Sequence, residues 1–261
     1  MAISLALPAL LGVVAAGLTN YLADQLPRTG RLSAATCPNC GAERPWVEHL
    51  IPARCRSCAR PPSPRRWVVA AGMAILSVFI WLRPQALGYP LGLVLLTYFA
   101  VVVVIDIEHR LVLGTTSLFG VPLALGMGWR LNGWEATLAG GLAGLVMMGA
   151  VHQLGRLFVR RQARRIRAEG GSLDDEEALG AGDVTLAAIL GLLLGWPLIW
   201  FELLLGALLA GAVGLVIVLI FLLRGQGAHR ALAVYMPYGP CLVLGAFLIL
   251  FLPSLVASFL P

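Results

Sequence analysis

The amino-acid sequence predicts an all-α, polytopic membrane protein with about eight transmembrane helices and a small cysteine-bearing cytoplasmic insertion between the first two. Hydrophobic residues make up 59% of the 261 residues and charged residues only 12%, whereas a soluble domain carries about 25% charged residues. The mean hydropathy is +0.86. The basic residues lie between long apolar segments. Together these observations exclude an ordinary soluble protein.

Eight apolar segments account for the predicted helices, and most are close to the roughly 20 residues that cross a bilayer. The sixth is short, and we expect it to tilt, to thin the bilayer or to join its neighbour through Pro197. In chain order the segments are 3–21, 67–82, 91–105, 111–129, 134–159, 184–195, 198–223 and 241–259.

The arginines predict the topology. All 19 basic residues are arginine, and only Arg83 and Arg130 fall on the side opposite the other seventeen. By the positive-inside rule, the arginine-rich side is cytoplasmic and both termini lie outside. The net charge of +6 is explained by contact with anionic lipid headgroups, so we expect membrane lipid and no nucleic acid as a partner.

Three parts follow from this map: residues 1–23 as the first helix, 24–66 as the cytoplasmic insertion, and 67–261 as a membrane-embedded domain. A second polar stretch, 156–179, is expected to be a mobile, solvated loop. Gly140 and Gly144, four residues apart, predict close helix packing.

The insertion contains two C-x2-C pairs separated by fourteen residues. Four thiolates at this spacing are typical of a tetrahedral zinc site. The reducing cytoplasm disfavours disulfides, and so short a polar segment has too little core to fold without a metal. We therefore expect a structural zinc, with free or redox-active cysteines as the alternative; its ligands would be Cys37, Cys40, Cys55 and Cys58. Cys241, alone in the last apolar segment, is expected in the core.

Two aspartates lie at predicted cytoplasmic helix ends. Asp106 ends an apolar run, and Asp183 closes Gly180-Ala181-Gly182 before another one. A carboxylate beside hydrocarbon is costly, so such groups usually have a function. Two carboxylates that share a proton can hydrolyse a peptide without a metal, because one activates water while the other donates to the carbonyl oxygen. The sequence thus predicts an intramembrane aspartyl dyad.

Other interpretations stay open for the polar residues near these sites. Gly180 and Gly182 would let an extended substrate approach or would allow unusual φ/ψ values, yet the same segment could simply begin a helix with Asp183 as its N-terminal acid. Glu108 either orients Asp106 or belongs to a solvated connection. Asp24 is interpreted as a surface or capping acid, and Glu202 as a residue near the outer interface.

At these residues the chain resembles the type IV prepilin peptidase family, membrane aspartyl proteases of the GxGD type. Gly17, Asn20 and Pro27 resemble the family's opening helix, and the cysteine pairs follow in the expected loop. The segments around Asp106 and Asp183 resemble the two catalytic motifs. The signature that begins the last helix is matched by Pro237, Gly239 and Pro240.

The resemblance implies an aspartic endopeptidase in the bacterial inner membrane, with 67–261 as its peptidase domain and Asp106 and Asp183 as its catalytic pair. It would remove the basic leader peptide from prepilins or pseudopilins at the cytoplasmic face. Many members also methylate the new N-terminus with S-adenosylmethionine, and this second activity is left open because the stretch 41–54 is short.

Two other functions are weighed against the peptidase. Paired membrane acids also serve proton-coupled transporters, although such acids are expected deeper in the bilayer. A non-catalytic pilus-assembly scaffold, with the cysteine insertion as its binding element, is the second alternative. The sequence leaves open which prepilin is cleaved, the oligomeric state and whether the aspartates meet without substrate.

Overall fold

In the computed structural model the chain forms two compact units, Met1–Thr116 and Ser117–Pro261. The description covers residues 2–32, 35–37, 40–44, 54–59, 61–83, 86–110, 113–168, 180–225 and 237–256.

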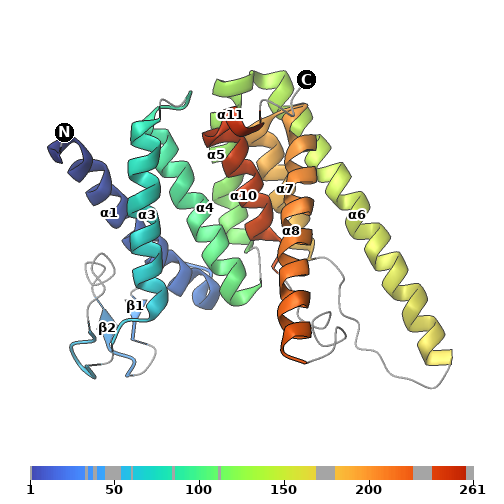
Figure 1. Cartoon of the computed structure of the whole chain (residues 1–261), viewed down its shortest axis with the longest axis horizontal. Helices are drawn as coiled ribbons and strands as arrows, with labels where there is room; N and C mark the ends of the chain where they lie inside the picture. The colour runs from blue at the N-terminus through green and yellow to red at the C-terminus, as the bar shows by residue number, and fades with distance from the viewer. Residues whose placement is uncertain are drawn as a thin grey trace. The chain divides into compact units, whose positions relative to one another are not determined.

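The first unit is built from three helices and the cysteine insertion (Figure 1). Its helices are α1 (Ala2–Thr29), α3 (Pro64–Leu82) and α4 (Tyr89–His109), and α1 packs against both of the others. In the insertion, β1 (Ala35–Thr36) pairs antiparallel with β2 (Glu43–Arg44). Because α1 reaches Thr29 and α3 begins at Pro64, the helices include both ends of the predicted 24–66 insertion.

Helix α1 approaches each partner closely. A Cβ added at Gly12 would lie 2.6 Å from the Met73 carbonyl oxygen, so the α1 and α3 backbones nearly touch there. At its other end, α1 packs Ala23 and Leu26 against Val101 and Ile105 of α4. The last turn of α4, which carries Asp106, therefore rests on the end of α1.

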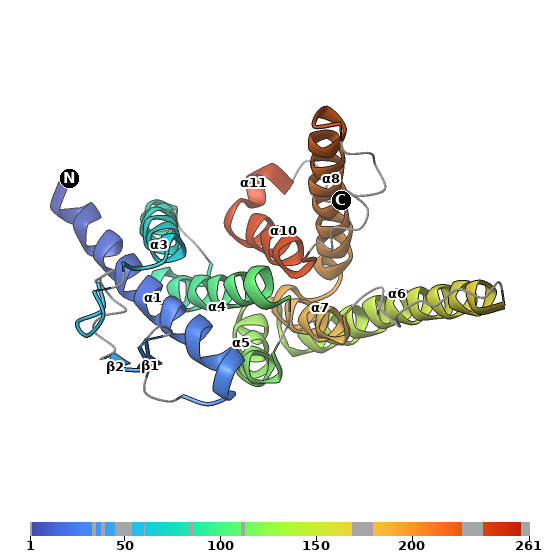
Figure 2. The same cartoon turned by 90° about the horizontal axis from the view of Figure 1, so that it is seen from below.

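In the second unit, other helices pack around the short helix α7 (Ala181–Leu194) (Figure 2). Helix α5 (Gly114–Asn132) begins in the first unit and lies mostly in the second. It is followed by α6 (Trp134–Ala168), α7 (Ala181–Leu194), α8 (Leu198–Leu223), α10 (Gly239–Phe251) and the short α11 (Pro253–Val256). Helix α7 packs against α6, α8 and α10.

Glycines allow α6 and α7 to touch along their backbones. A Cβ added at Gly140 would lie 2.4 Å from the Gly191 carbonyl oxygen, and one at Gly144 would lie 2.3 Å from that of Ala187. Both distances are shorter than any real Cβ contact. The predicted close packing at Gly140 and Gly144 is confirmed, and the facing helix contributes Gly191 as its own small residue.

The short sixth segment is a buried helix. Helix α7 has 14 residues, about 21 Å at 1.5 Å per residue, less than the roughly 30 Å of a hydrocarbon core. Leu186, Leu190 and Leu193 are each at most 1% exposed. Because α7 is covered by protein, its length need not match the bilayer. It ends at Leu194 with Gly195 as its C-cap, and Pro197 is the N-cap of α8.

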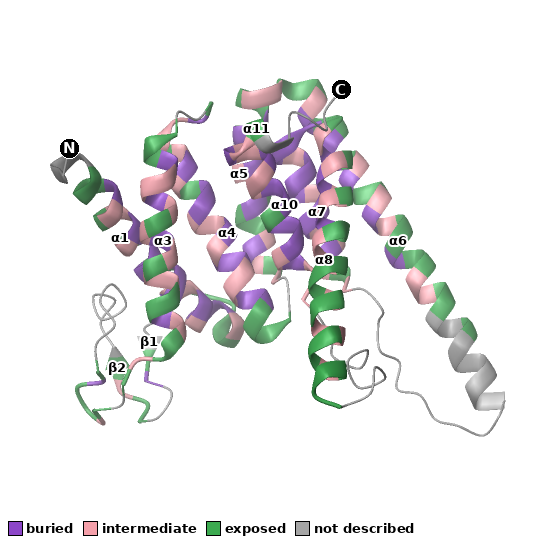
Figure 3. Cartoon of the chain, viewed as in Figure 1, coloured by how far each residue is buried: buried purple, intermediate pink, exposed green. Residues whose placement is uncertain are grey.

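The all-α membrane fold is confirmed, with eight long helices among the described residues. Five of them are long and apolar enough to cross a bilayer: α1 from Leu5, α3, α4, α6 as far as Phe158, and α8. Figure 3 shows buried residues concentrated on α7 and α10, whereas much of α8 is exposed. The exposed α8 residues include Leu208, Leu215 and Leu219, which suits contact with lipid.

Two expected boundaries are wrong. The predicted loop at 156–179 is helical as far as Ala168, where α6 ends, because the arginines, alanines and glutamine of this stretch favour a helix as well as a loop. Residues 169–179 lie outside the described part of the chain. The last predicted helix, 241–259, is interrupted at Leu252, since Pro253 cannot continue the α10 hydrogen-bond ladder.

Candidate active site and metal centre

Asp106 lies buried in the last turn of α4, with 4% of its surface exposed. Arg110 ends the helix in a left-handed conformation (φ 55°, ψ 37°), and its backbone N–H donates to the Asp106 carbonyl oxygen at 2.8 Å. Ile105 packs into the α1–α4 core. The backbone at Asp106 is therefore fixed by the packing of Ile105 before it and by the hydrogen bond from Arg110 after it.

A cluster of charged side chains joins the ends of α1, α3 and α4 in the first unit. The Arg65 guanidinium, in the first turn of α3, donates to Asp24 Oδ1 and Glu108 Oε2 at 2.5 Å each. Arg66 donates to Asp24 Oδ2 at 2.9 Å. Asp24 is therefore not a simple surface or capping acid, and Glu108 is not merely solvated. Sequence reasoning missed this cluster, because the arginines lie 41 to 43 residues from the acids in the chain.

Asp183 lies buried in the first turn of α7. Its backbone N–H donates to the Gly180 carbonyl oxygen at 3.1 Å, and Gly180 is the N-cap with φ −65° and ψ 141°. Gly180 therefore has an ordinary extended backbone, and the unusual conformation considered for it is absent. An added Cβ there would lie 3.9 Å from Asp183 Oδ2, so glycine leaves the space beside the carboxyl open. The helix N-terminus also favours negative charge at Asp183.

Asp106 belongs to the first unit and Asp183 to the second. The structure therefore gives each carboxyl its own surroundings within its unit, a buried position at a helix end in both cases. That the two carboxyls act as a pair remains a prediction.

The predicted signature Pro237, Gly239 and Pro240 leads into α10, with Gly239 as its first residue. Between these residues, Tyr238 lines an apolar cavity of about 350 Å³ together with side chains of α6 and α8. Burial first, and then the charges of Glu202 and Asp183, raise the pKa of Tyr238 to about 12. Tyr238 and Asp183 both belong to the second unit.

Glu202 is fully buried in α8 at 0% exposure. Neither carboxyl oxygen has a hydrogen-bond partner within the described residues. A Cβ added at Gly245 of α10 would lie 3.5 Å from Glu202 Oε1, so glycine leaves room for the carboxyl between α8 and α10. The position of Glu202 near the outer interface remains a prediction, and its side chain is enclosed by protein.

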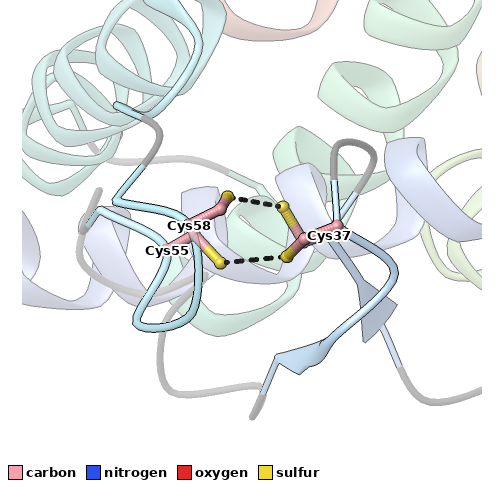
Figure 4. Close-up of side chains that lie close together, drawn as sticks. Cys37, Cys55 and Cys58 are labelled. Atoms are coloured by element: carbon pink, nitrogen blue, oxygen red, sulfur yellow. Dashed lines mark hydrogen bonds between the residues drawn. The ribbon is translucent and has the colours of Figure 1, made fainter.

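The four predicted ligands Cys37, Cys40, Cys55 and Cys58 converge in the insertion, with their Sγ atoms within 4.8 Å of one another (Figure 4). Cys37 Sγ is 3.8 Å from Cys58 Sγ, and Cys40 Sγ is 3.7 Å from Cys55 Sγ. A tetrahedral metal with bonds of about 2.3 Å requires S···S distances of about 3.8 Å. The cluster therefore fits a tetrahedral metal ion.

The two cysteine pairs form the same backbone turn. Gly41 N–H donates to the Cys37 carbonyl oxygen at 2.9 Å, and Ala59 N–H donates to that of Cys55 at 2.8 Å. Both donors are left-handed, with φ 70° at Gly41 and φ 55° at Ala59. Matching turns aim the two thiol pairs at one point. Cys241, in contrast, is buried in α10, as predicted.

Comparison with known proteins gives matches over most of the chain. The model of the type IV leader peptidase family matches residues 93–219, a range that includes both aspartates. A prepilin leader peptidase/N-methyltransferase of Myxococcus xanthus (strain DK1622) is 27% identical over 235 residues, which cover 84% of this chain and 64% of that protein.

Two further relatives carry the same name. The protein of Aeromonas hydrophila is 25% identical over 87% of this chain and 74% of its own length. The protein of Pseudomonas putida is 27% identical over 83% of this chain and 71% of its own length. No solved structure gives a significant match.

Proposed function

We propose that this chain, whose residues 93–219 belong to the type IV leader peptidase family, is a membrane aspartic endopeptidase that removes leader peptides from prepilins or pseudopilins. The observation that carries the proposal is the position of Asp106 and Asp183. Both fall inside the family match, and both are buried at helix ends rather than exposed to solvent. The proton-coupled transporter and the non-catalytic scaffold find no support among the relatives.

In the proposed reaction, Asp106 and Asp183 hold one proton and one water molecule between them. The ionised carboxyl takes a proton from the water as its oxygen attacks the scissile carbonyl carbon, and the protonated carboxyl donates to the carbonyl oxygen. Collapse of the tetrahedral intermediate breaks the C–N bond. The carboxyl that took the proton from water passes it to the leaving amine, and the hydroxyl formed from the carbonyl returns its proton to the other carboxyl. Like charges so close together cannot both ionise easily, so the pair titrates as a unit.

The substrate and orientation follow from the same proposal. A basic leader would meet the acid-bearing ends of the membrane helices at the cytoplasmic face of the bacterial inner membrane. The apolar segment that follows the leader would remain among the helices, where burial of apolar surface favours it. Relatives' names give prepilins as the substrate class.

Zinc is proposed as the structural metal of the cysteine insertion. Four thiolates at tetrahedral distances fill the coordination sphere, so the metal would fold the insertion and leave no position for a substrate. Methyl transfer from S-adenosylmethionine, the second activity in the relatives' names, takes second place to proteolysis because the stretch 41–54 is short. Labelled S-adenosylmethionine in the cleavage assay tests it: label on the mature N-terminus would add this activity.

The test is leader removal from a prepilin in reconstituted membranes, comparing the parent with Asp106→Asn and Asp183→Asn at matched amounts of folded protein. Glu135→Gln is the control, because Glu135 is an exposed acid in the first turn of α6. We expect cleavage by the parent and the control and none by the two aspartate variants. Cleavage that survives either aspartate substitution would overturn the aspartyl mechanism.

A further inference from the structure

We propose that Arg65 is a positioning residue, whose guanidinium ties Asp24 of α1 to Glu108 of α4 and thereby fixes the turn that carries Asp106. The inference rests on the proposed function, in which Asp106 is catalytic. It concerns the first unit alone, where all four residues lie.

The contacts are those of a forked cation between two carboxylates. Arg65 Nη2 is 2.5 Å from Asp24 Oδ1, and Arg65 Nη1 is 2.5 Å from Glu108 Oε2. The Arg65 side chain is 17% exposed, so water only partly screens the two ion pairs. Guanidinium presents its donors in a fixed planar fork, which a lysine ammonium cannot reproduce. Because the Arg65 guanidinium is rigid and binds a carboxylate on each helix, it also fixes the spacing between α1 and α4.

An ion pair at Glu108 restrains the turn of α4 that carries Asp106. It lies two residues after Asp106 in the last turn of α4, and terminal turns fray readily because their backbone groups are only partly paired. Ile105, on the other side of Asp106, already packs against Ala23 of α1. The apolar contact and the ion pair thus join the same two helix ends on either side of Asp106.

Arg65 and Arg66 make different contacts in this cluster. Arg66 also binds Asp24, through Oδ2 at 2.9 Å, so Asp24 keeps one cation when Arg65 is removed. No second cation contacts Glu108 in the described part of the chain. Loss of Arg65 therefore chiefly releases Glu108 and the last turn of α4, while the α1–α3 contact through Arg66 remains.

The position of Arg65 in the chain also connects it to the cysteine insertion. Arg65 follows the last cysteine ligand, Cys58, by seven residues and is the second residue of α3. The segment that the metal would order therefore leads directly into the residue that holds α4. A misplacement of about 1 Å at a catalytic group can cost about 100-fold in rate, so a modest shift of this turn would be measurable.

The experiment measures kcat and KM for leader cleavage by the full chain in reconstituted membranes, for Arg65→Gln, Glu108→Gln and the double variant. Arg28→Gln is the matched control, since Arg28 is an exposed arginine in the last turn of α1. We expect kcat to fall about 10- to 100-fold in Arg65→Gln with KM nearly unchanged. The double variant should be no worse than the poorer single variant, because both remove one contact.

A second readout does not depend on cleavage. Amide hydrogen exchange in residues 105–109 should be faster in Arg65→Gln and in Glu108→Gln than in the parent, and unchanged in Arg28→Gln. Arg65→Lys, which keeps the charge but not the fork, should fall between the parent and Arg65→Gln in both measurements.

The outcomes separate the two proposals. A parent that cleaves no prepilin overturns the proposed function, while the exchange data still report whether Arg65 holds the end of α4. A parent-like kcat in Arg65→Gln, additive effects in the double variant, or unchanged exchange at 105–109 would overturn the positioning role. If Arg65→Gln does not fold, Arg65→Lys and Glu108→Gln provide the same comparison.

Discussion

The backbone contact between α6 and α7 makes Gly144→Ala a sharp test of how the second unit holds Asp183. The added Cβ would lie 2.3 Å from the Ala187 carbonyl oxygen, against 3.4 Å for the start of ordinary contact. The obstacle is backbone, so the helices must part by about 1 Å or α7 must shift. Overpacking of a filled core costs about 1–3 kcal/mol, and we expect the upper end because no flexible side chain can give way.

The assay is thermal unfolding in detergent, followed by tryptophan fluorescence, with cleavage measured on the same samples. A loss of about 3 kcal/mol should lower the Tm by about 6–12 °C in a chain of this size. Gly149→Ala is the control, because its Cβ would lie 3.8 Å from Val184 Cγ1 of the same neighbouring helix. Alanine is better than glycine in a helix by about 0.5–1 kcal/mol, so this control should be as stable as the parent or more so.

The result that would refute this reasoning is equal Tm values for Gly144→Ala and Gly149→Ala. Cleavage should also fall in Gly144→Ala below the melting temperature, because α7 carries Asp183 near its start. A large loss of stability with full activity would show that Asp183 keeps its place when the α6–α7 contact opens.

Three further predictions follow from the buried groups. Cys37→Ser should lose a bound zinc, present at about one per chain in the parent, as measured by mass spectrometry, whereas Cys241→Ser should keep it because Cys241 lies in the core of α10; zinc retained in Cys37→Ser would contradict the four-thiolate site. Glu202→Leu should raise stability by about 1–3 kcal/mol, because neither carboxyl oxygen has a partner within the described residues, and a lower Tm would show that the carboxyl is paired in the membrane. Burial raises the pKa of Tyr238 from 10.0 to about 12. The stability that the neutral phenol contributes is therefore present below pH 10 and is lost as the pH rises through about 12. Above pH 10, the Tm of Tyr238→Phe should fall less steeply with pH than the Tm of the parent, and equal slopes would contradict this.

Much of the fold and one site could be predicted because they depend on local pattern. Apolar runs predict membrane helices, and two C-x2-C pairs need only their own turns to bring four thiols together. Gly140 and Gly144 indicated a close contact because four residues place them on one helix face. The partner Gly191 required the structure, since nothing in the sequence says which helix faces α6.

The remaining features depend on tertiary contacts that spacing does not encode. Arg65 meets Asp24 and Glu108 from residues 41 and 43 positions away in the chain, so only the packing of three helix ends reveals the cluster. Helix α7 looked like a short membrane span because hydropathy does not distinguish contact with lipid from contact with protein. The extension of α6 to Ala168 was missed because arginine suits both helices and solvated loops.

The pairing of Asp106 with Asp183 is tested most directly by thiol cross-linking of the double variant Asp106→Cys/Asp183→Cys in native membranes, with and without prepilin. Two carboxyls that share a water keep their Cβ atoms farther apart than the about 3.5–4.5 Å of a disulfide, so a short bifunctional thiol reagent is used in place of oxidation. The matched control is Ile107→Cys/Asp183→Cys, because Ile107 is the next residue of α4 and is exposed. We predict a cross-link at 106 and 183, with or without substrate, and little at 107 and 183. A failure to cross-link 106 with 183 under both conditions would contradict the aspartyl pair.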